Sequence, residues 1–440
     1  MKTTTKILIQ NGLIVTNNKE DDVFVGDLLI SDTKIRKVSK KTLKGESGID
    51  QVIDATDKFV IPGFVQAHTH LCQTLFRGEA DDLALIDWLR EKIWPFEAAH
   101  NATSMRASAL YGTYEMQMNG TTSILDMGSV HHTQSLLEAV AETGLRYWGG
   151  KCLMDRKGSV LSQSTEDALK ETEDLSVEWA EKNPLINYAL CPRFVVSCTE
   201  GLLKDVRELQ AQHGQVVHTH ASENKDEVKL VRKLTKMDNV SYLDKLKLLN
   251  PKTAIVHAIH LTEKEIGRLA KTKTPIVHCP SSNMKLGSGL APITKYLKKG
   301  ITVGLGGDGA PCNNSMDPFK EMHLAAILQK PVFGPAALDA RTAFRLATLG
   351  GAKVLGVADK IGSLEAGKLA DVVLVDRSHP SVYTVADPYS ALVYSCTGRD
   401  VTDVVIHGKT IIRHRVHQLL DRDLVYSQAL SEKKKLLQRI

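Results

Sequence analysis

Short apolar runs that alternate with helical patterns constrain the fold of this chain more than any other feature. The runs span residues 58–65, 121–127, 145–153, 185–190, 215–220, 254–259, 275–279 and 301–306. Amphipathic stretches separate them, for example residues 135–144 and 168–182. Strands that alternate with helices form parallel sheets, and about eight such units favour a closed (β/α)8 barrel. We therefore predict an α/β chain in which residues 61–360 form a TIM-like barrel.

The two ends of the chain carry a different pattern, one of short strands without intervening helices. Residues 6–16 hold an Asn-Gly turn between two apolar runs, and alternating apolar positions return at 370–376 and 403–412. An Asn-Gly pair between apolar runs is typical of a β-hairpin. We expect residues 1–60 and 361–420 to pair as one small, discontinuous β-sandwich domain. Residues 421–440 should then form a C-terminal helix with a solvated end.

Composition excludes several classes of protein. In the 440-residue chain, 56 Lys and Arg against 51 Asp and Glu leave a net charge of +5, so no nucleic-acid surface is expected. No apolar run approaches the ~18 residues of a membrane span, and the N-terminus lacks the pattern of a signal peptide. The 7 cysteines are scattered, without a CxxC pair, which favours free thiols in a reducing cytoplasm. We therefore expect a cytoplasmic globular protein whose partner is a small molecule.

Polar residues gather at the ends of the apolar runs, where a barrel places its active site. His68-Thr69-His70 follows the first run, and residues two apart on an extended segment point to the same face. The fifth run ends in His218-Thr219-His220-Ala221-Ser222-Glu223. His257 ends the sixth run, and Asp308 follows the eighth between glycines.

Such a set of side chains indicates a mononuclear metal site with an open position. Imidazoles and one carboxylate suit Zn²⁺, which lowers the pKa of bound water toward ~7 and makes hydroxide available. Hydrolysis also needs a proton shuttle, and Glu223, three residues past His220, suits that role. Asp308 could orient the water while also binding metal, and His257 could polarise the electrophile. We expect one divalent ion per subunit, Zn²⁺ first, with Fe²⁺ and Mn²⁺ as alternatives.

The motifs VIPGFVQAHTH, HTHASE, VHAIHL and GGDGAPCNN resemble those of the amidohydrolase superfamily, in its single-metal deaminase branch. The resemblance covers nearly the whole chain. It implies His68, His70, His220 and Asp308 as metal ligands and leaves His218 as a neighbour. It also implies Glu223 as the acid/base and places His257 near the metal or the substrate. The habit of the family further suggests a homo-oligomer.

Residues 75–97 resemble the segment after the first strand in 5-methylthioadenosine/S-adenosylhomocysteine deaminases and 5'-deoxyadenosine deaminases. In those enzymes the Trp of the DWL motif packs near the purine nucleoside, and the Glu of the WPxE stretch bonds ribose hydroxyls. The matching residues here are Trp88 and Glu97. An aromatic ring can stack on a base, and a carboxylate can accept hydrogen bonds from a diol.

Three positions depart from that subfamily. Cys191-Pro192-Arg193-Phe194 resembles guanine deaminase, in which the Arg helps to hold the purine carbonyl, and Gln73 matches a substrate-binding Gln of guanine and 8-oxoguanine deaminases. Lys151, in a segment that resembles guanine deaminase and triazine hydrolases, stands about where methylthioadenosine deaminases use Arg. An Arg and a Gln aimed into a pocket suit ring nitrogens or a carbonyl.

We therefore predict a metal-dependent hydrolytic deaminase of adenosine-like nucleosides, in which metal-bound hydroxide attacks the carbon that bears the amine and ammonia leaves. The alternatives within the same fold are a guanine or oxopurine deaminase, which Gln73 and Arg193 favour, and an s-triazine amino- or chlorohydrolase. A barrel that binds a ligand without turnover is an alternative of another class. The joint presence of the ligand set and a shuttle carboxylate argues against it.

Overall fold

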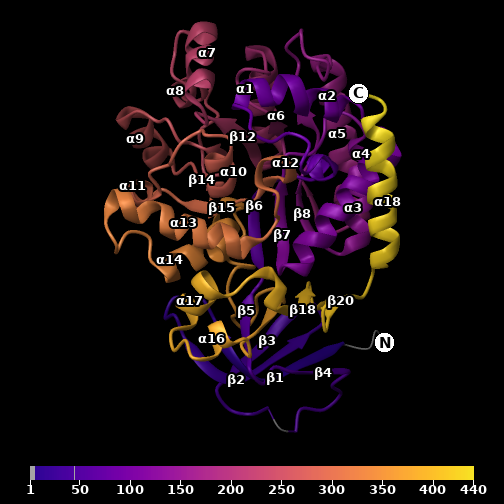
Figure 1. Ribbon diagram of the computed structural model, residues 1–440, viewed down its shortest axis with the longest axis vertical. Helices are drawn as coiled ribbons and strands as arrows, with labels where there is room; N and C mark the ends of the chain where they lie inside the picture. Colours follow the sequence, from indigo (N-terminus) through magenta and orange to yellow (C-terminus); the bar gives the residue numbers. More distant parts are fainter. Residues whose placement is uncertain (1–4, 44) are drawn as a thin grey trace.

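The computed structural model describes residues 5–43 and 45–440, and its central feature is a parallel barrel (Figure 1). The barrel strands are β6 (Phe64–His70), β7 (Thr121–Asp126), β8 (Arg146–Gly149), β10 (Ile186–Tyr188), β12 (Val217–Ala221), β13 (Thr253–His257), β14 (Ile276–His278) and β15 (Val303–Leu305). All neighbouring pairs are parallel. The bridge Phe194↔His220 joins the two groups of strands on one side, and β16 (Asp308–Gly309) pairs with β6 on the other. The predicted TIM-type barrel is confirmed.

Helices surround the barrel strands and connect them (Figure 1). The outer helices include α3 (Ala102–Met118), α4 (Thr133–Thr143), α5 (Thr165–Lys182), α6 (Glu200–His213), α9 (Glu263–Thr272), α11 (Ile293–Lys298), α13 (Pro318–Phe333), α14 (Ala340–Arg345), η3 (Leu346–Gly350) and α15 (Gly351–Val354). Side-chain caps start several of them: Ser164 accepts from the Asp167 amide at α5, and Thr199 from the Leu202 amide at α6. Left-handed glycines end α4 and α6, as expected for a C-terminal cap.

Further helices and short strands build the end of the barrel at which the strands finish. They are η1 (Leu71–Phe76), α1 (Leu85–Asp87), η2 (Trp88–Ile93), α2 (Trp94–Ala98), β9 (Cys152–Leu153), β11 (Cys191–Pro192), α7 (Lys225–Thr235), α8 (Asn239–Lys245), α10 (Pro280–Lys285) and α12 (Ala310–Asn313). Because η1, η2 and α2 lie between β6 and α3, the segment with Gln73, Trp88 and Glu97 covers the carboxyl ends of the strands.

Strands from both chain ends join in one nine-stranded sheet below the barrel (Figure 1). They are β1 (Lys6–Val15), β2 (Val23–Ser31), β3 (Lys34–Ser39), β4 (Gln51–Asp54), β5 (Lys58–Pro62), β17 (Val372–Asp376), β18 (Val401–Ile406), β19 (Lys409–Arg413) and β20 (Val416–His417). The short helices α16 (Pro380–Tyr383), α17 (Pro388–Ser390), η4 (Ala391–Ser395) and η5 (Gly398–Asp400) connect β17 to β18. Strand β5 pairs with β1 and with β17. The run at 58–65, expected as one barrel strand, is thus divided: its first part belongs to this sheet, and the barrel strand begins at Phe64.

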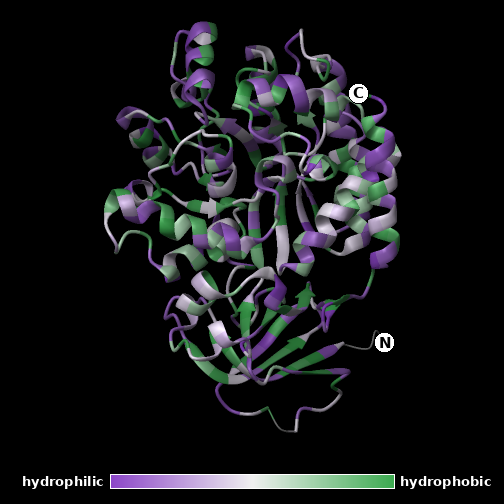
Figure 2. Ribbon diagram, in the orientation of Figure 1, coloured by the Kyte–Doolittle hydropathy of each residue, from purple (hydrophilic) through white to green (hydrophobic). Residues whose placement is uncertain are grey.

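Gly63 marks the division between sheet and barrel because there is no room for a side chain: a Cβ there would lie 2.1 Å from Thr122 Oγ1. β7 is buried along its whole length, and the barrel strands combine buried apolar residues with buried polar ones (Figure 2). A buried ion pair joins barrel and sheet, with Arg146 Nε 3.0 Å from Asp371 Oδ2.

All seven cysteines, which lie within the described residues, are free and buried. Among the described residues, no helix is long and apolar enough to cross a membrane.

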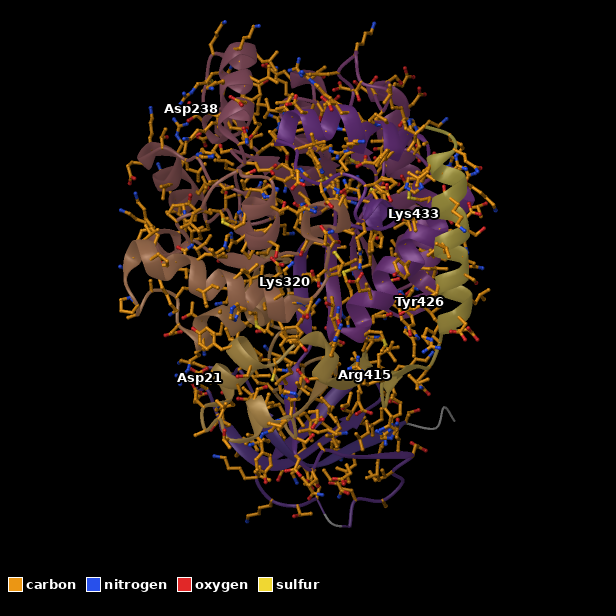
Figure 3. The ribbon with its side chains drawn as sticks, viewed as in Figure 1. Asp21, Asp238, Lys320, Arg415, Tyr426 and Lys433 are labelled. Carbon is orange, nitrogen blue, oxygen red and sulfur yellow. The ribbon has the colours of Figure 1, made fainter. Side chains whose placement is uncertain are left out.

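The C-terminal helix α18 (Arg422–Leu437) lies along the outside of the barrel beside α3 (Figure 1). Its end is not simply solvated as expected, because Ala429 and Leu436 are buried in a cluster that also contains Trp88. Lys433, labelled in Figure 3, donates a 3.1 Å hydrogen bond to the carbonyl of Arg77. The helix therefore supports the segment that covers the strand ends.

Candidate active site

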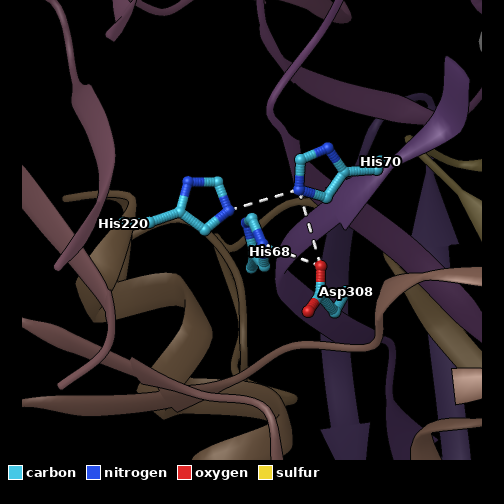
Figure 4. A group of neighbouring side chains, drawn as sticks. All are labelled: His68, His70, His220 and Asp308. Carbon is cyan, nitrogen blue, oxygen red and sulfur yellow. Dashed lines mark hydrogen bonds and ion pairs between the residues drawn. The ribbon is translucent and has the colours of Figure 1, made fainter. Parts of the chain in front are cut away.

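Four side chains from the predicted set meet at the carboxyl ends of three barrel elements (Figure 4). His68 and His70 lie on β6, His220 on β12 and Asp308 at the start of β16. His70 Nε2 lies 3.3 Å from His220 Nε2 and 3.5 Å from Asp308 Oδ1. His68 Nε2 lies 3.2 Å from the same carboxylate oxygen. One ligand atom from each of the four residues lies within 4.8 Å of every other.

These distances fit a single bound metal ion. Ligand atoms on a tetrahedral zinc, each roughly 2.0–2.1 Å from the ion, lie roughly 3.3 Å apart. Burial, followed by the neighbouring imidazoles of His68 and His70, lowers the pKa of His220 well below its ordinary range. The imidazoles are therefore neutral at physiological pH, which is the form that binds a metal. Buried His68 Nε2 makes no well-aligned hydrogen bond among the described residues, although Asp308 Oδ1 lies 3.2 Å away, as expected when two atoms face a common metal position.

Outer contacts orient the imidazoles by occupying their second ring nitrogens. His220 Nδ1 lies 2.7 Å from the carbonyl oxygen of Arg193, which places the proton on Nδ1 and leaves Nε2 free. His68 Nδ1 lies 2.8 Å from His218 Nε2. His218, predicted only as a neighbour of the ligands, thus contacts His68 on the side away from the cluster and fixes its ring.

Backbone strain accompanies this arrangement. Asp308 and His257 have φ angles of 58° and 67°, and Ser222 has 56°, in the left-handed region that residues with a Cβ rarely adopt. Such conformations persist only where the surroundings impose them, and they concentrate at functional sites. Three of them at the ends of three barrel strands indicate that this end of the barrel is built for a function.

Glu223 and His257 lie beside the four-residue cluster. His257 Nε2 is 3.5 Å from Glu223 Oε2 and 3.9 Å from Asp308 Oδ2. Burial, and then the charge of Asp308, raise the pKa of Glu223 well above its ordinary range. Because a protonated carboxyl group can donate, Glu223 is suited to deliver a proton to a bound molecule.

Asn283 sets the orientation of His257, and the sequence did not single it out. The side-chain oxygen of Asn283 lies 2.8 Å from His257 Nδ1, which places the proton on that nitrogen. Burial lowers the pKa of His257, so its ring is neutral and its Nε2 faces Glu223. Asn283 lies on α10, just after β14, and this position beyond a strand end is the signal in the sequence that could have found it.

A cavity opens beside the cluster. Its polar lining includes His70, His220, Glu223, His257 and Asp308, together with the predicted substrate-binding residues Gln73 and Arg193. Apolar side chains form the rest of the lining: Leu85, Trp88, Leu89, Phe194 and Leu286. Trp88 and these apolar residues thus line the same cavity as the cluster.

Glu97, which was predicted to bind ribose hydroxyls, does not line this cavity. It contacts Gln73 and Arg193, which were predicted to bind the purine ring. Its carboxylate accepts from Arg193 at 2.7 and 3.0 Å and from Gln73 Nε2 at 2.7 Å. Glu97 is 6% exposed and Arg193 3%. The structure therefore joins Gln73, Glu97 and Arg193 in one buried network, in which Glu97 neutralises Arg193.

The structure does not bring Lys151 to the cavity. Its ammonium group lies 2.7 Å from Glu171 Oε2 and also donates to the carbonyl of Val130. Two glycines, Gly149 and Gly150, interrupt the strand just before it. The predicted substrate contact of Lys151 stays a prediction, and Lys151 does not line this cavity.

Comparison with known proteins agrees with this geometry. The amidohydrolase family profile matches residues 59–411. The 5-methylthioadenosine/S-adenosylhomocysteine deaminase of Thermococcus sibiricus is 38% identical over 411 residues, which cover 92% of this chain and 94% of that protein. The 5'-deoxyadenosine deaminase of Methanothermobacter thermautotrophicus is 38% identical over 416 residues, 92% of this chain and 93% of that protein.

Among solved structures, an adenosine deaminase from Xanthomonas campestris with bound zinc superposes with a TM-score of 0.93 at 31% identity, over 99% of both chains. The match of the family profile extends over most of the chain, from the last strand before the barrel to β19. It spans the barrel and each residue of the metal-type cluster. The chain belongs to the amidohydrolase family.

Proposed function

We propose that the chain is a metal-dependent hydrolytic deaminase of adenosine-like nucleosides, with 5'-deoxyadenosine, methylthioadenosine and S-adenosylhomocysteine as the substrates to test first. The observation that carries the proposal is the position of Glu223, next to the four-residue cluster and inside a cavity walled by Trp88. The names of the relatives at 38% identity support the same substrate class.

In this proposal His68, His70, His220 and Asp308 hold one divalent ion, Zn²⁺ in preference to Fe²⁺ or Mn²⁺. The ion, when bound, acidifies a water and so supplies the nucleophile. Asp308 accepts the proton of that water, and Glu223 donates a proton to a ring nitrogen of the substrate. His257, oriented by Asn283, contacts the substrate beside Glu223. Trp88 and its apolar neighbours exclude solvent from the ring.

Removal of the metal is expected to abolish turnover. Three neutral imidazoles and a carboxylate converge with free acceptor atoms, an arrangement that a cation stabilises. Dialysis against a chelator should lower ammonia release to background, and added Zn²⁺ should restore it. Zn²⁺ at 100 times its Kd should also raise the free energy of unfolding by about 2.7 kcal/mol. Full turnover by protein with under one-tenth of an ion per chain would contradict the metal assignment.

A specific observation favours the alternative of a guanine or oxopurine deaminase. Gln73 and Arg193 line the cavity, whereas Glu97, the residue proposed to bind ribose, does not. An s-triazine hydrolase would use the same hydrolytic machinery with a different leaving group. Because Glu97 already accepts from Arg193 and Gln73, binding of ribose hydroxyls would require this network to rearrange.

A panel of substrates discriminates these readings. Ammonia release should be measured with 5'-deoxyadenosine, methylthioadenosine, S-adenosylhomocysteine, adenosine, guanine, 8-oxoguanine and one aminotriazine. We expect turnover of the 5'-modified adenosines and little release from guanine. Turnover of guanine or triazine alone would replace the proposed substrate class and assign specificity to Gln73 and Arg193.

The domain formed by the two chain ends, the oligomeric state and the cellular compartment are also proposals. We propose that residues 1–60 and 361–420 form a small β-sandwich domain beside the catalytic barrel of residues 61–360. We also propose that the protein is a cytoplasmic homo-oligomer. The free, buried state of all seven cysteines supports a reducing compartment. Light scattering of the purified protein tests the oligomer.

A further inference from the structure

The backbone of the loop that carries Glu223 donates hydrogen bonds to a second buried carboxylate, that of Glu227. Glu227 lies at the start of α7 and is 1% exposed. Its Oε2 accepts from the backbone amide of Glu223 at 2.7 Å and from that of Asn224 at 3.4 Å. Its Oε1 accepts from the amide of Ser222 at 3.3 Å and from the side chain of Asn239. One side chain thus contacts three consecutive amides around the proposed acid/base.

This pattern exceeds an ordinary helix cap. A Glu at the third helical position usually returns one hydrogen bond to the amide of the capping residue, which here is Asn224. Among the backbone amides that Glu227 binds, the shortest bond goes instead to Glu223, which precedes the cap. The bond to Asn239 also ties the start of α8 to the same loop. The contacts therefore converge on the segment that ends β12, and not only on the helix.

The segment needs such support because its backbone is strained. Ser222 has a left-handed φ of 56°, and this turn aims Glu223 back toward His257. The carbonyl of Ser222 accepts from the amides of Ile259 and His260, both at 2.9 Å. The turn is thus fixed on its carbonyl side by the loop after β13 and on its amide side by Glu227.

We propose that Glu227 is a positioning residue, which fixes the backbone of Ser222–Asn224 and so holds the Glu223 carboxyl group within reach of substrate and His257. The inference rests on the proposed function, in which Glu223 transfers the proton. A displacement of about 1 Å at a reacting group can cost about 100-fold in rate, so small shifts of this loop matter.

Glu227→Gln tests the inference, because Gln keeps the size but places an N–H where an acceptor is required. We expect kcat on the substrate that the wild type turns over to fall about 10- to 100-fold, with metal content and KM nearly unchanged. In the Glu223→Gln background the same change should cost less than about twofold, because Glu227 acts through Glu223. Glu227→Asp should keep more activity than Glu227→Gln.

Glu265→Gln is the matched control. Glu265 is also 1% exposed and also caps a helix, α9, but its hydrogen bonds go to Thr262 and Ser241, neither of which lines the cavity. The Glu265→Gln variant should have a lower free energy of unfolding than the wild type, whereas its kcat should stay within about twofold of the wild-type value. The inference would be overturned if Glu227→Gln and Glu265→Gln lowered kcat equally. It would also be overturned if Glu227→Gln lowered kcat as much in the Glu223→Gln background as in the wild type.

Hydrogen exchange gives a readout that does not depend on turnover. The amides of residues 222–224 should exchange faster in Glu227→Gln than in the wild type, and in Glu265→Gln they should not. If no substrate of the panel is turned over, the proposed function fails by itself, and exchange alone then decides whether Glu227 holds this loop. Unchanged exchange at residues 222–224 would refute the inference.

Discussion

Replacing Glu223 with Gln should lower kcat by about 10²- to 10⁴-fold, the usual contribution of a general acid/base. Gln cannot transfer the proton, whereas burial and the charge of Asp308 raise the pKa of the Glu223 carboxyl group and favour the form that can donate. The fold and the four proposed ligands remain intact, so the bound metal should stay near one ion per chain. Steady-state ammonia release and elemental analysis measure the two quantities on the same preparation.

Asp308→Asn provides the comparison for that experiment. Asp308 contacts both His68 and His70, so the amide should weaken metal binding as well as turnover. Loss of activity with retained metal in Glu223→Gln, and loss of both in Asp308→Asn, would separate proton transfer from ligation. A Glu223→Gln enzyme within tenfold of wild-type kcat would remove the acid/base assignment.

Replacing Glu97 with Ala should lower the free energy of unfolding by about 3–5 kcal/mol, because it leaves the buried guanidinium of Arg193 without its partner. The two groups form two hydrogen bonds, at 2.7 and 3.0 Å, in a nearly water-free setting. Urea unfolding followed by circular dichroism measures the loss. Activity should fall for all substrates, since Arg193 lines the cavity and its carbonyl orients His220.

Two variants control the Glu97 experiment. Glu178→Ala removes an exposed pair with Lys182 and should change stability by less than about 1 kcal/mol. Glu97→Leu combined with Arg193→Met removes both buried charges and should recover much of the stability, though not the activity. A Glu97→Ala protein as stable as Glu178→Ala would show that Arg193 finds other partners or water.

The barrel, and the meeting of histidines and Asp308 at its strand ends, could be predicted because the end of a strand is a local property of a sequence. The choice of His220 over His218 as a ligand came from the resemblance to the amidohydrolases. The position of Lys151 could not be predicted, since two glycines, the last residue of β8 and the one after it, break the alternation that places side chains on one face. Glu97 follows a helical pattern that gives no sign of its buried partner Arg193, 96 residues further on.

Residues that support the site from helices were missed for a related reason. Asn283 and Glu227 lie in the first turns of α10 and α7, where small polar and acidic residues are expected as ordinary caps. Their contacts to His257 and Glu223 depend on how loops after different strands meet. The closure of the barrel brings these loops together, so no short segment of the sequence predicts the contacts between them.

The sheet shared by the two chain ends has a consequence for synthesis on the ribosome. Strand β5 needs β17 as its neighbour, yet β17 begins at residue 372, about 310 residues after β5 ends. At 5–20 residues per second, β5 waits roughly 15–60 s for that partner. Phe59, Val60 and Ile61, all buried in the finished protein, belong to an open edge during this interval. The nascent N-terminal strands therefore need protection from edge-to-edge association until the C-terminal part of the chain has been made.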